Sequence, residues 1–86
     1  MDFDYSIRRS GNIEITGYHG SAARIVIPQS IEDHPVVAIG DNAFSWASGL
    51  VSVTLPEGLL TIGEAAFSWC ESLQEISMPS SLRSIG

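Results

Sequence analysis

The chain repeats itself at a fixed interval. The segment "AIGDNAFSWA" at residues 38–47 returns as "TIGEAAFSWC" at residues 61–70, a shift of 23 residues. The same shift aligns further residues of like character, namely Gly40 with Gly63, Phe44 with Phe67, Trp46 with Trp69, Leu50 with Leu73, Val53 with Ile76, Leu55 with Met78, Pro56 with Pro79, Leu59 with Leu82 and Ile62 with Ile85. A period of this length is typical of a solenoid, in which each repeat forms one coil that buries its apolar side against neighbouring coils.

One period, residues 50–72, indicates how a coil is built. In "LVSVTLP" the apolar Val53 and Leu55 alternate with Ser52 and Thr54, which predicts a half-buried strand. The next segment, "GLLTIG", predicts a second short strand, and "EAAFSWC" places apolar residues at the spacing of one tight helical turn. We therefore expect a right-handed, β-rich solenoid in which parallel strands alternate with short helical turns.

The region before the first coil has a different pattern. "FDYSI" and "IEI" alternate apolar and polar residues on either side of an "SGN" turn, which predicts a β-hairpin that covers the apolar end of the solenoid. The expected organisation is a single domain with a hairpin cap at 1–21, a first irregular coil at 22–49, a second coil at 50–72 and an incomplete third coil at 73–86. The first coil is five residues longer than the period, and we expect the extra residues, in "QSIEDHPVVAIG", to form a longer loop.

The charge balance disfavours two classes of partner. The 86 residues carry a formal charge of −6, with four arginines and no lysine, so the chain would repel nucleic acids and anionic membrane surfaces. No apolar run is long enough to insert across a membrane. The first residues, "MDFDYSIRRSG", are not a secretion signal, so either the protein is cytoplasmic or a signal lies outside this sequence.

No set of residues in the sequence predicts catalysis, a metal site or a cofactor. His34 stands in an "EDHP" segment whose acidic neighbours have no nucleophile spaced to join them, so we expect solvated loop residues there. Cys70 lacks a second cysteine ligand, and Ala47 fills the same column one coil earlier, which indicates a small buried position.

The recurring pattern L-x-x-V-x-L-P-x-x-L-x-x-I-G-x-x-A-F-x-x-C resembles the BspA-type leucine-rich repeat of bacterial surface proteins and some protozoan ones. The resemblance covers residues 22–86. It implies a leucine-rich repeat solenoid, and the family's roles in adhesion and protein binding imply a protein partner and a cell-surface or secreted location. Trp46 and Trp69 depart from the pattern, because the family commonly has glycine or another small residue there, and Ala47 replaces the usual cysteine.

Two surfaces are candidates for binding a protein partner. The first is the tryptophan pair, Trp46 and Trp69, which stacked coils would bring together, since exposed aromatic pairs are typical of contact hot spots on proteins or sugars. The second is the outward face of the main strands, with the candidate residues Arg24, Ser52, Thr54, Glu75 and Ser77. The alternatives are that the indoles cover the edge of the helical turns and that the strand face is an ordinary solvated surface.

A third candidate surface is the last coil. The sequence stops at "SSLRSIG", before a third "AF" turn, and no C-terminal cap is recognisable. The apolar residues expected at this end are Leu73, Ile76, Met78, Leu82 and Ile85. We expect either a longer array of coils or pairing of this end with a second copy, as a twofold homodimer, because the hairpin would block head-to-tail contact. The leading interpretation is a non-catalytic protein-binding module, the alternative is a structural or self-associating scaffold, and an enzyme is a distant third.

Overall fold

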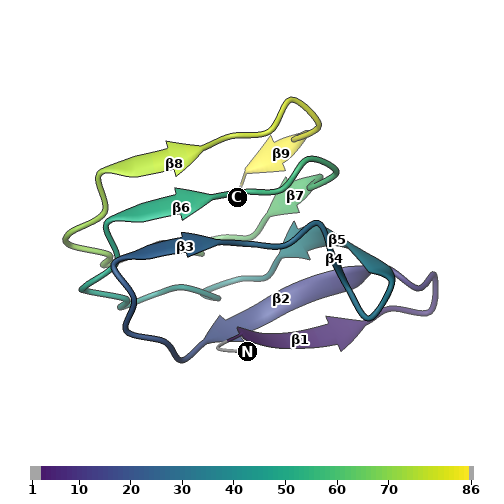
Figure 1. Ribbon diagram of the computed structural model, residues 1–86, viewed down its shortest axis with the longest axis horizontal. Helices are drawn as coiled ribbons and strands as arrows, with labels where there is room; N and C mark the ends of the chain where they lie inside the picture. Colours follow the sequence, from purple (N-terminus) through teal and green to yellow (C-terminus); the bar gives the residue numbers. More distant parts are fainter. Residues whose placement is uncertain (1–2, 86) are drawn as a thin grey trace.

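The computed structural model describes residues 3–85 as a stack of about three coils, 34 × 25 × 19 Å in extent (Figure 1). Residues 1, 2 and 86, which the predicted cap and third coil include, lie outside the described range. The strands are β1 (Phe3–Ile7), β2 (Ile13–Tyr18), β3 (Arg24–Val26), β4 (Ser30–Ile31), β5 (His34–Ile39), β6 (Ser52–Thr54), β7 (Thr61–Ile62), β8 (Glu75–Ser77) and β9 (Ser84–Ile85).

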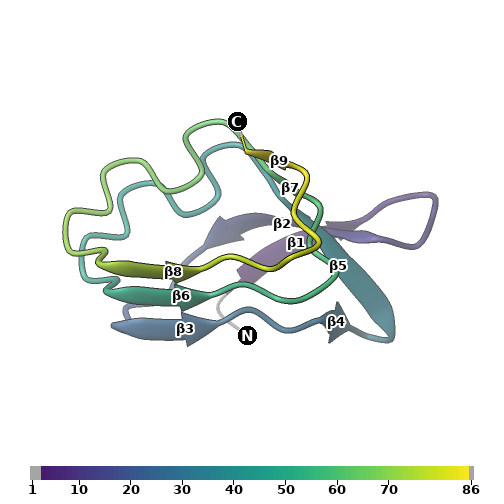
Figure 2. The same cartoon turned by 90° about the horizontal axis from the view of Figure 1, so that it is seen from above.

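The strands form two sheets that line different sides of the stack (Figures 1 and 2). One sheet has the order β1-β2-β5-β7-β9, with β4 paired to β5, and the other has the order β3-β6-β8. Like strands of successive coils pair in parallel, so that Val53 lies between Ile25 and Ile76. The predicted parallel solenoid and its 23-residue register are confirmed.

A β-hairpin covers the first coil. β1 and β2 pair antiparallel, and β2 then pairs in parallel with β5, the first strand of the regular ladder. The side chains of Ile13 and Ile15 in β2 are fully buried where the hairpin meets the first coil. The hairpin therefore shields apolar surface at this end of the stack, as predicted.

The extra residues of the first coil form a second hairpin rather than the expected longer loop. β4 pairs antiparallel with the start of β5, and the turn residues Glu32 and Asp33 both have left-handed backbone conformations. His34 lies half-buried in β5 with its Nδ1 atom 2.8 Å from the carbonyl oxygen of Gly11, and the Tyr5 hydroxyl donates to the Glu32 carboxylate. The expectation of solvated loop residues is wrong for His34, whose ring connects the two hairpins.

The core consists of the inward-facing residues of both sheets and of the turn segments between them. The largest side chains with almost no exposed surface are Phe44, Ile13, Ile15, Ile27, Ile39, Leu50, Leu59, Val36 and Val53. Within the described residues no charged or polar side chain is fully buried with them. Burial of apolar side chains in this core is therefore the main source of the stability of the fold.

The segments predicted as helical turns contain no helix within the described residues. In residues 40–51 and 63–74 the backbone makes consecutive turns, which Figure 2 shows as two winding paths that run side by side. Backbone N–H groups of the first segment donate to carbonyl oxygens of the second, from Asn42 to Glu64, from Phe44 to Ala66 and from Trp46 to Ser68. Because these donors bond between coils, they cannot make the bonds to residue i−4 that define a helix.

Candidate functional site

Two columns of aromatic rings run along the stack. The inner column contains Tyr18, Phe44 and Phe67, and its ring centroids are 5.2 Å apart at both steps. Phe44 is fully buried, and Phe67 in the next coil is half-buried. This column is part of the hydrophobic core.

The outer column consists of Trp46 and Trp69. Their ring centroids lie 5.1 Å apart and their planes are inclined by only 8°, so the indoles are stacked face to face. The two residues are 68% and 62% exposed. The indoles therefore face solvent and do not cover the edge of the turns, which was the alternative that the sequence left open.

Both tryptophans have a backbone conformation that favours glycine. The φ angle is +69° at Trp46 and +62° at Trp69, in the left-handed region. Each residue other than glycine in this region costs about 1–2 kcal/mol, so the two tryptophans together cost about 2–4 kcal/mol, whereas their one stacked pair contributes about 0.5–1.5 kcal/mol beyond the area it buries. The pair therefore adds little net stability to the fold.

The second predicted surface is the outer face of the β3-β6-β8 sheet. The strand register forms two rows across this face, one of Arg24, Ser52 and Glu75 and one of Val26, Thr54 and Ser77, and all of these residues are exposed except Ser52, which is half-buried. The structure thus brings the predicted strand residues together. Val26, which is 71% exposed, adds an apolar residue to one end of this otherwise polar face.

The third predicted surface is the last described coil. Leu73, Ile76 and Leu82 pack against the core but remain partly exposed. Met78 is 51% exposed and Ile85 is 59% exposed. All five predicted residues therefore lie at one end of the stack with exposed apolar surface.

The described residues contain no candidate metal-binding site. No group of three or more His, Cys, Asp or Glu side chains gathers as metal ligands within residues 3–85. Burial raises the pKa of the Cys70 thiol above its usual value, and a hydrogen bond with the Ala47 backbone, which lowers the pKa, offsets only part of this effect. The thiol itself donates a hydrogen bond to the carbonyl oxygen of Phe44. A protonated, hydrogen-bonded thiol is a weak nucleophile.

Within residues 3–85 no helix has the length and apolar character to cross a bilayer.

Parallel strand ladders, a 23-residue period and an N-terminal hairpin define a leucine-rich repeat solenoid. A sequence model described as "BspA type Leucine rich repeat region (6 copies)" matches residues 18–86. The chain belongs to the BspA-type leucine-rich repeat family, as its sequence pattern indicated. Proteins of this family are commonly found at the bacterial cell surface, and leucine-rich repeat domains generally mediate protein interactions on typically non-catalytic scaffolds.

Solved structures share the fold. A leucine-rich repeat protein of T. pallidum superimposes with a TM-score of 0.95 at 36% identity, over 98% of this chain and 40% of that one. A leucine-rich repeat protein from Bacteroides capillosus ATCC 29799 gives a TM-score of 0.86 at 22% identity, over 99% and 83%. A leucine rich cell surface protein from Faecalibacterium prausnitzii A2-165 gives 0.65 at 23% identity, over 98% and 31%.

This chain thus spans two fifths of the length of the T. pallidum protein. Among curated protein sequences, none matches it at a significant level.

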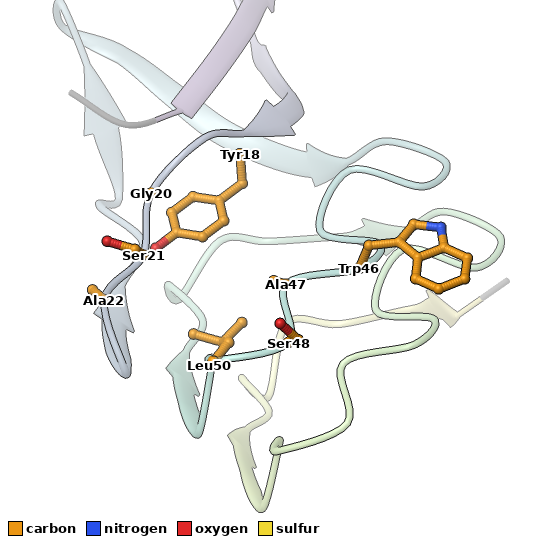
Figure 3. A pocket seen from close by; sticks show the side chains of 9 residues that line it. Tyr18, Gly20, Ser21, Ala22, Trp46, Ala47, Ser48 and Leu50 are labelled. Carbon is orange, nitrogen blue, oxygen red and sulfur yellow. The ribbon is translucent and has the colours of Figure 1, made fainter.

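Sequence reasoning located the tryptophan pair but did not predict the left-handed backbone conformation of the two residues. The left-handed conformation at Trp46 and Trp69 favours glycine, the type of residue that the resemblance implied at these positions. That departure from the family pattern was the available signal. Sequence reasoning also missed a hollow of about 320 Å³ that Tyr18, Trp46 and Leu50 help to line (Figure 3).

Proposed function

We propose that this chain is a non-catalytic module that recognises a protein partner at the bacterial cell surface through the Trp46–Trp69 pair. The outer face of β3, β6 and β8 serves as a second contact. The main observation that supports this proposal is that two successive coils place large, exposed indoles at positions whose left-handed backbone conformation glycine would adopt without strain. Residues held in sparsely populated backbone conformations cluster at binding and active sites, where the surrounding structure holds them in place.

The geometry of the pair supports a role in binding. Exposed tryptophans are the residues that most often dominate the energy of protein interfaces. Each indole here has its ring position fixed by stacking on the other, so little side-chain freedom is lost when a partner binds. The cell-surface part of the proposal is supported by the family, whose members are commonly found there.

The proposal is tested by selecting binders from a phage-displayed random peptide library against the immobilised chain. The selected peptides are then measured against the Trp46→Gly/Trp69→Gly variant, which removes both rings without adding strain. We expect binding to weaken by about tenfold or more, because the aromatic hot-spot contacts are lost. The comparison variant is Ser52→Ala/Thr54→Ala, which changes only the second contact, the strand face, and should weaken binding less than the loss of both indoles.

Two results would refute this role for the tryptophans. One is a set of selected peptides whose affinity is the same for the wild type and the double glycine variant. The other is a set whose affinity falls only with the strand-face variant, which would move the site to the β3-β6-β8 sheet.

The exposed end of the last coil supports a second function, self-association. Apolar side chains that are buried in the preceding coil, such as Ile62, correspond here to exposed ones, such as Ile85. A hollow of about 280 Å³ opens beside them, with Phe67 in its lining. Two copies related by a twofold axis would present the same surface to each other and cover both sets of residues.

Light scattering coupled to size-exclusion chromatography tests self-association. We expect the mass to rise from one chain toward two as concentration increases, and to stay at one chain in Met78→Glu/Ile85→Glu. Val26→Glu is the matched control, because it places a carboxylate on an exposed apolar position away from the last coil. A wild-type mass of one chain at every concentration would exclude the dimer.

A further inference from the structure

The charged side chains on the two turn segments are all negative. These segments, residues 40–51 and 63–74, carry the tryptophan pair together with Asp41, Glu64 and Glu71, and they contain no lysine or arginine. All three acidic residues are exposed. The four arginines of the chain lie elsewhere, in the N-terminal hairpin, in β3 and just before β9. The surface that presents the indoles is therefore both aromatic and acidic.

The acidic residues of the turn segments have no cation of their own chain. Within residues 3–85 the ion pairs join side chains at the N-terminal hairpin, and neither pair includes a turn segment. Oδ1 of Asp41 accepts a hydrogen bond from the backbone N–H of Glu64 at 2.7 Å, which holds this carboxylate at the neighbouring segment. Residues 25–82 contain seven acidic side chains and no lysine or arginine. The resulting field attracts a cationic partner and repels an anionic one.

Each indole also keeps a face open to a partner. Stacking covers one face of each ring, yet Trp46 and Trp69 remain 68% and 62% exposed. A ring with one covered face retains so much exposed surface only if most of its other face is open. In Figure 3 the indole of Trp46 extends away from the other labelled side chains. Among aromatic side chains tryptophan attracts a cation most strongly, at distances within about 6 Å of the ring centroid.

The guanidinium group of arginine fits an aromatic and acidic surface better than other cations do. It is planar, so it can lie flat on an indole while its N–H groups point sideways to carboxylate oxygens. An ammonium group is a strongly hydrated point charge, and it does not stack in this way. Glu71 follows Trp69 by two residues, so their Cα atoms are at most about 7 Å apart. One arginine side chain is long enough to reach both residues.

We propose that the partner segment recognised by the tryptophan pair is rich in arginine, with guanidinium groups on the open faces of the indoles and paired with the carboxylates of the turn segments. This inference rests on the proposed protein-binding function and adds the chemistry of the partner. Asp41 and Trp46 in one coil correspond to Glu64 and Trp69 in the next. The repeated arrangement suits a segment that carries more than one arginine.

Nuclear magnetic resonance titration of the whole chain with short peptides tests the proposal. The two tryptophans of the chain both belong to the pair, so the two indole N–H signals report on this site alone. The first probe is a peptide with blocked ends that has three arginines separated by glycines. In the second probe lysine replaces arginine, and in the third citrulline, a neutral and planar analogue of arginine, replaces it.

We expect the arginine peptide to shift both indole signals with a dissociation constant of about 0.1–1 mM. The lysine peptide should bind about threefold or more weakly because it does not stack, and the citrulline peptide about tenfold or more weakly because it has no charge. Three results would overturn the proposal: no indole shifts with the arginine peptide, equal binding of the lysine peptide, or equal binding of the citrulline peptide.

Two double variants separate the local charges from the net charge. Glu64→Gln/Glu71→Gln should weaken binding of the arginine peptide by about threefold or more. The matched control is Asp33→Asn/Glu57→Gln, at exposed positions outside the turn segments, and each variant changes the formal charge from −6 to −4. The control should weaken binding clearly less. Equal weakening by both variants would show that only the net charge acts and would overturn the proposal.

The phage selection distinguishes a failure of this inference from a failure of the proposed function. We expect the selected peptides to be enriched in arginine and to lose affinity when citrulline replaces it. Peptides that need both indoles but keep their affinity after this replacement would leave the protein-binding role intact and overturn the preference for arginine. Arginine-peptide binding that is unchanged in Trp46→Gly/Trp69→Gly, followed through the amides of residues 64–71, would place the cation elsewhere and also overturn it.

Discussion

The second coil and the last coil share a sequence pattern but differ in burial. Leu55 and Ile62 are 5% and 4% exposed, whereas Met78 and Ile85, 23 residues later, are 51% and 59% exposed. The same backbone pairing holds both coils, since β6 pairs with β8 and β7 with β9. The difference is that the second coil has a neighbour on each side and the last described coil has one.

The comparison shows that the burial of a repeat depends on its neighbours as much as on its own residues. In a solenoid each coil contacts only the adjacent coils, so stability is approximately a sum of coil and interface terms. Apolar columns that stabilise the middle of the stack become exposed surface at its end.

Leu59 and Leu82 occupy the same column and give the most direct test. Leu59 has no exposed surface and Leu82 is partly exposed. Leu59→Ala should lower the free energy of unfolding by about 2–5 kcal/mol, and Leu82→Ala by clearly less, because the end of the stack can relax around the smaller side chain. Urea denaturation followed by circular dichroism measures both, and equal losses would contradict the dependence on neighbours.

The second coil approaches the first closely at Gly63. A Cβ atom there would lie 2.5 Å from the backbone nitrogen of Asp41 and 2.6 Å from the carbonyl carbon of Gly40. Gly63→Ala should therefore cost about 1–3 kcal/mol through overpacking. At Gly49 a Cβ would meet no atom within 4 Å, so Gly49→Ala should leave the thermal midpoint unchanged or raise it. A harmless Gly63→Ala would mean that the coils can separate.

Ser81 fastens the last coil to the second. Its Oγ accepts a hydrogen bond from the Gly58 backbone at 2.9 Å and donates to the Leu59 carbonyl oxygen at 2.9 Å. Ser81→Ala should cost about 0.5–1.5 kcal/mol. The loss should be local, so amide hydrogen exchange should accelerate at Arg83, which bonds to Leu60, more than at Leu60, which bonds to Val37. Equal acceleration at both amides would show that the two coils unfold together.

The regular part of the fold could be predicted from the sequence because the period aligns columns without reference to coordinates. The columns placed Val53 beside Ile76, and the alternating residues before Gly11 predicted the hairpin. The prediction of helical turns was wrong. Apolar spacing indicates which side chains face inward, but it does not reveal that backbone N–H groups such as that of Phe44 donate to the next coil.

The candidate site was less accessible to sequence reasoning. The repeat placed Trp46 and Trp69 side by side, but their exposure depends on a left-handed backbone that the residue type itself disfavours. The hollow depends on a connection that is short relative to the later coils, and its boundaries are defined only once β2 and β3 are known.

The central claim is that the two tryptophans are present for binding and not for stability, in contrast to the phenylalanines beside them. The most direct test is the free energy of unfolding of the Trp46→Gly/Trp69→Gly variant, measured by urea denaturation and circular dichroism. We predict a change smaller than about 2 kcal/mol, because relief of the left-handed strain offsets the lost stacking and the partial burial of the rings. A loss larger than this, comparable with that of Leu59→Ala, would show that the indoles are part of the structural core and would contradict the account.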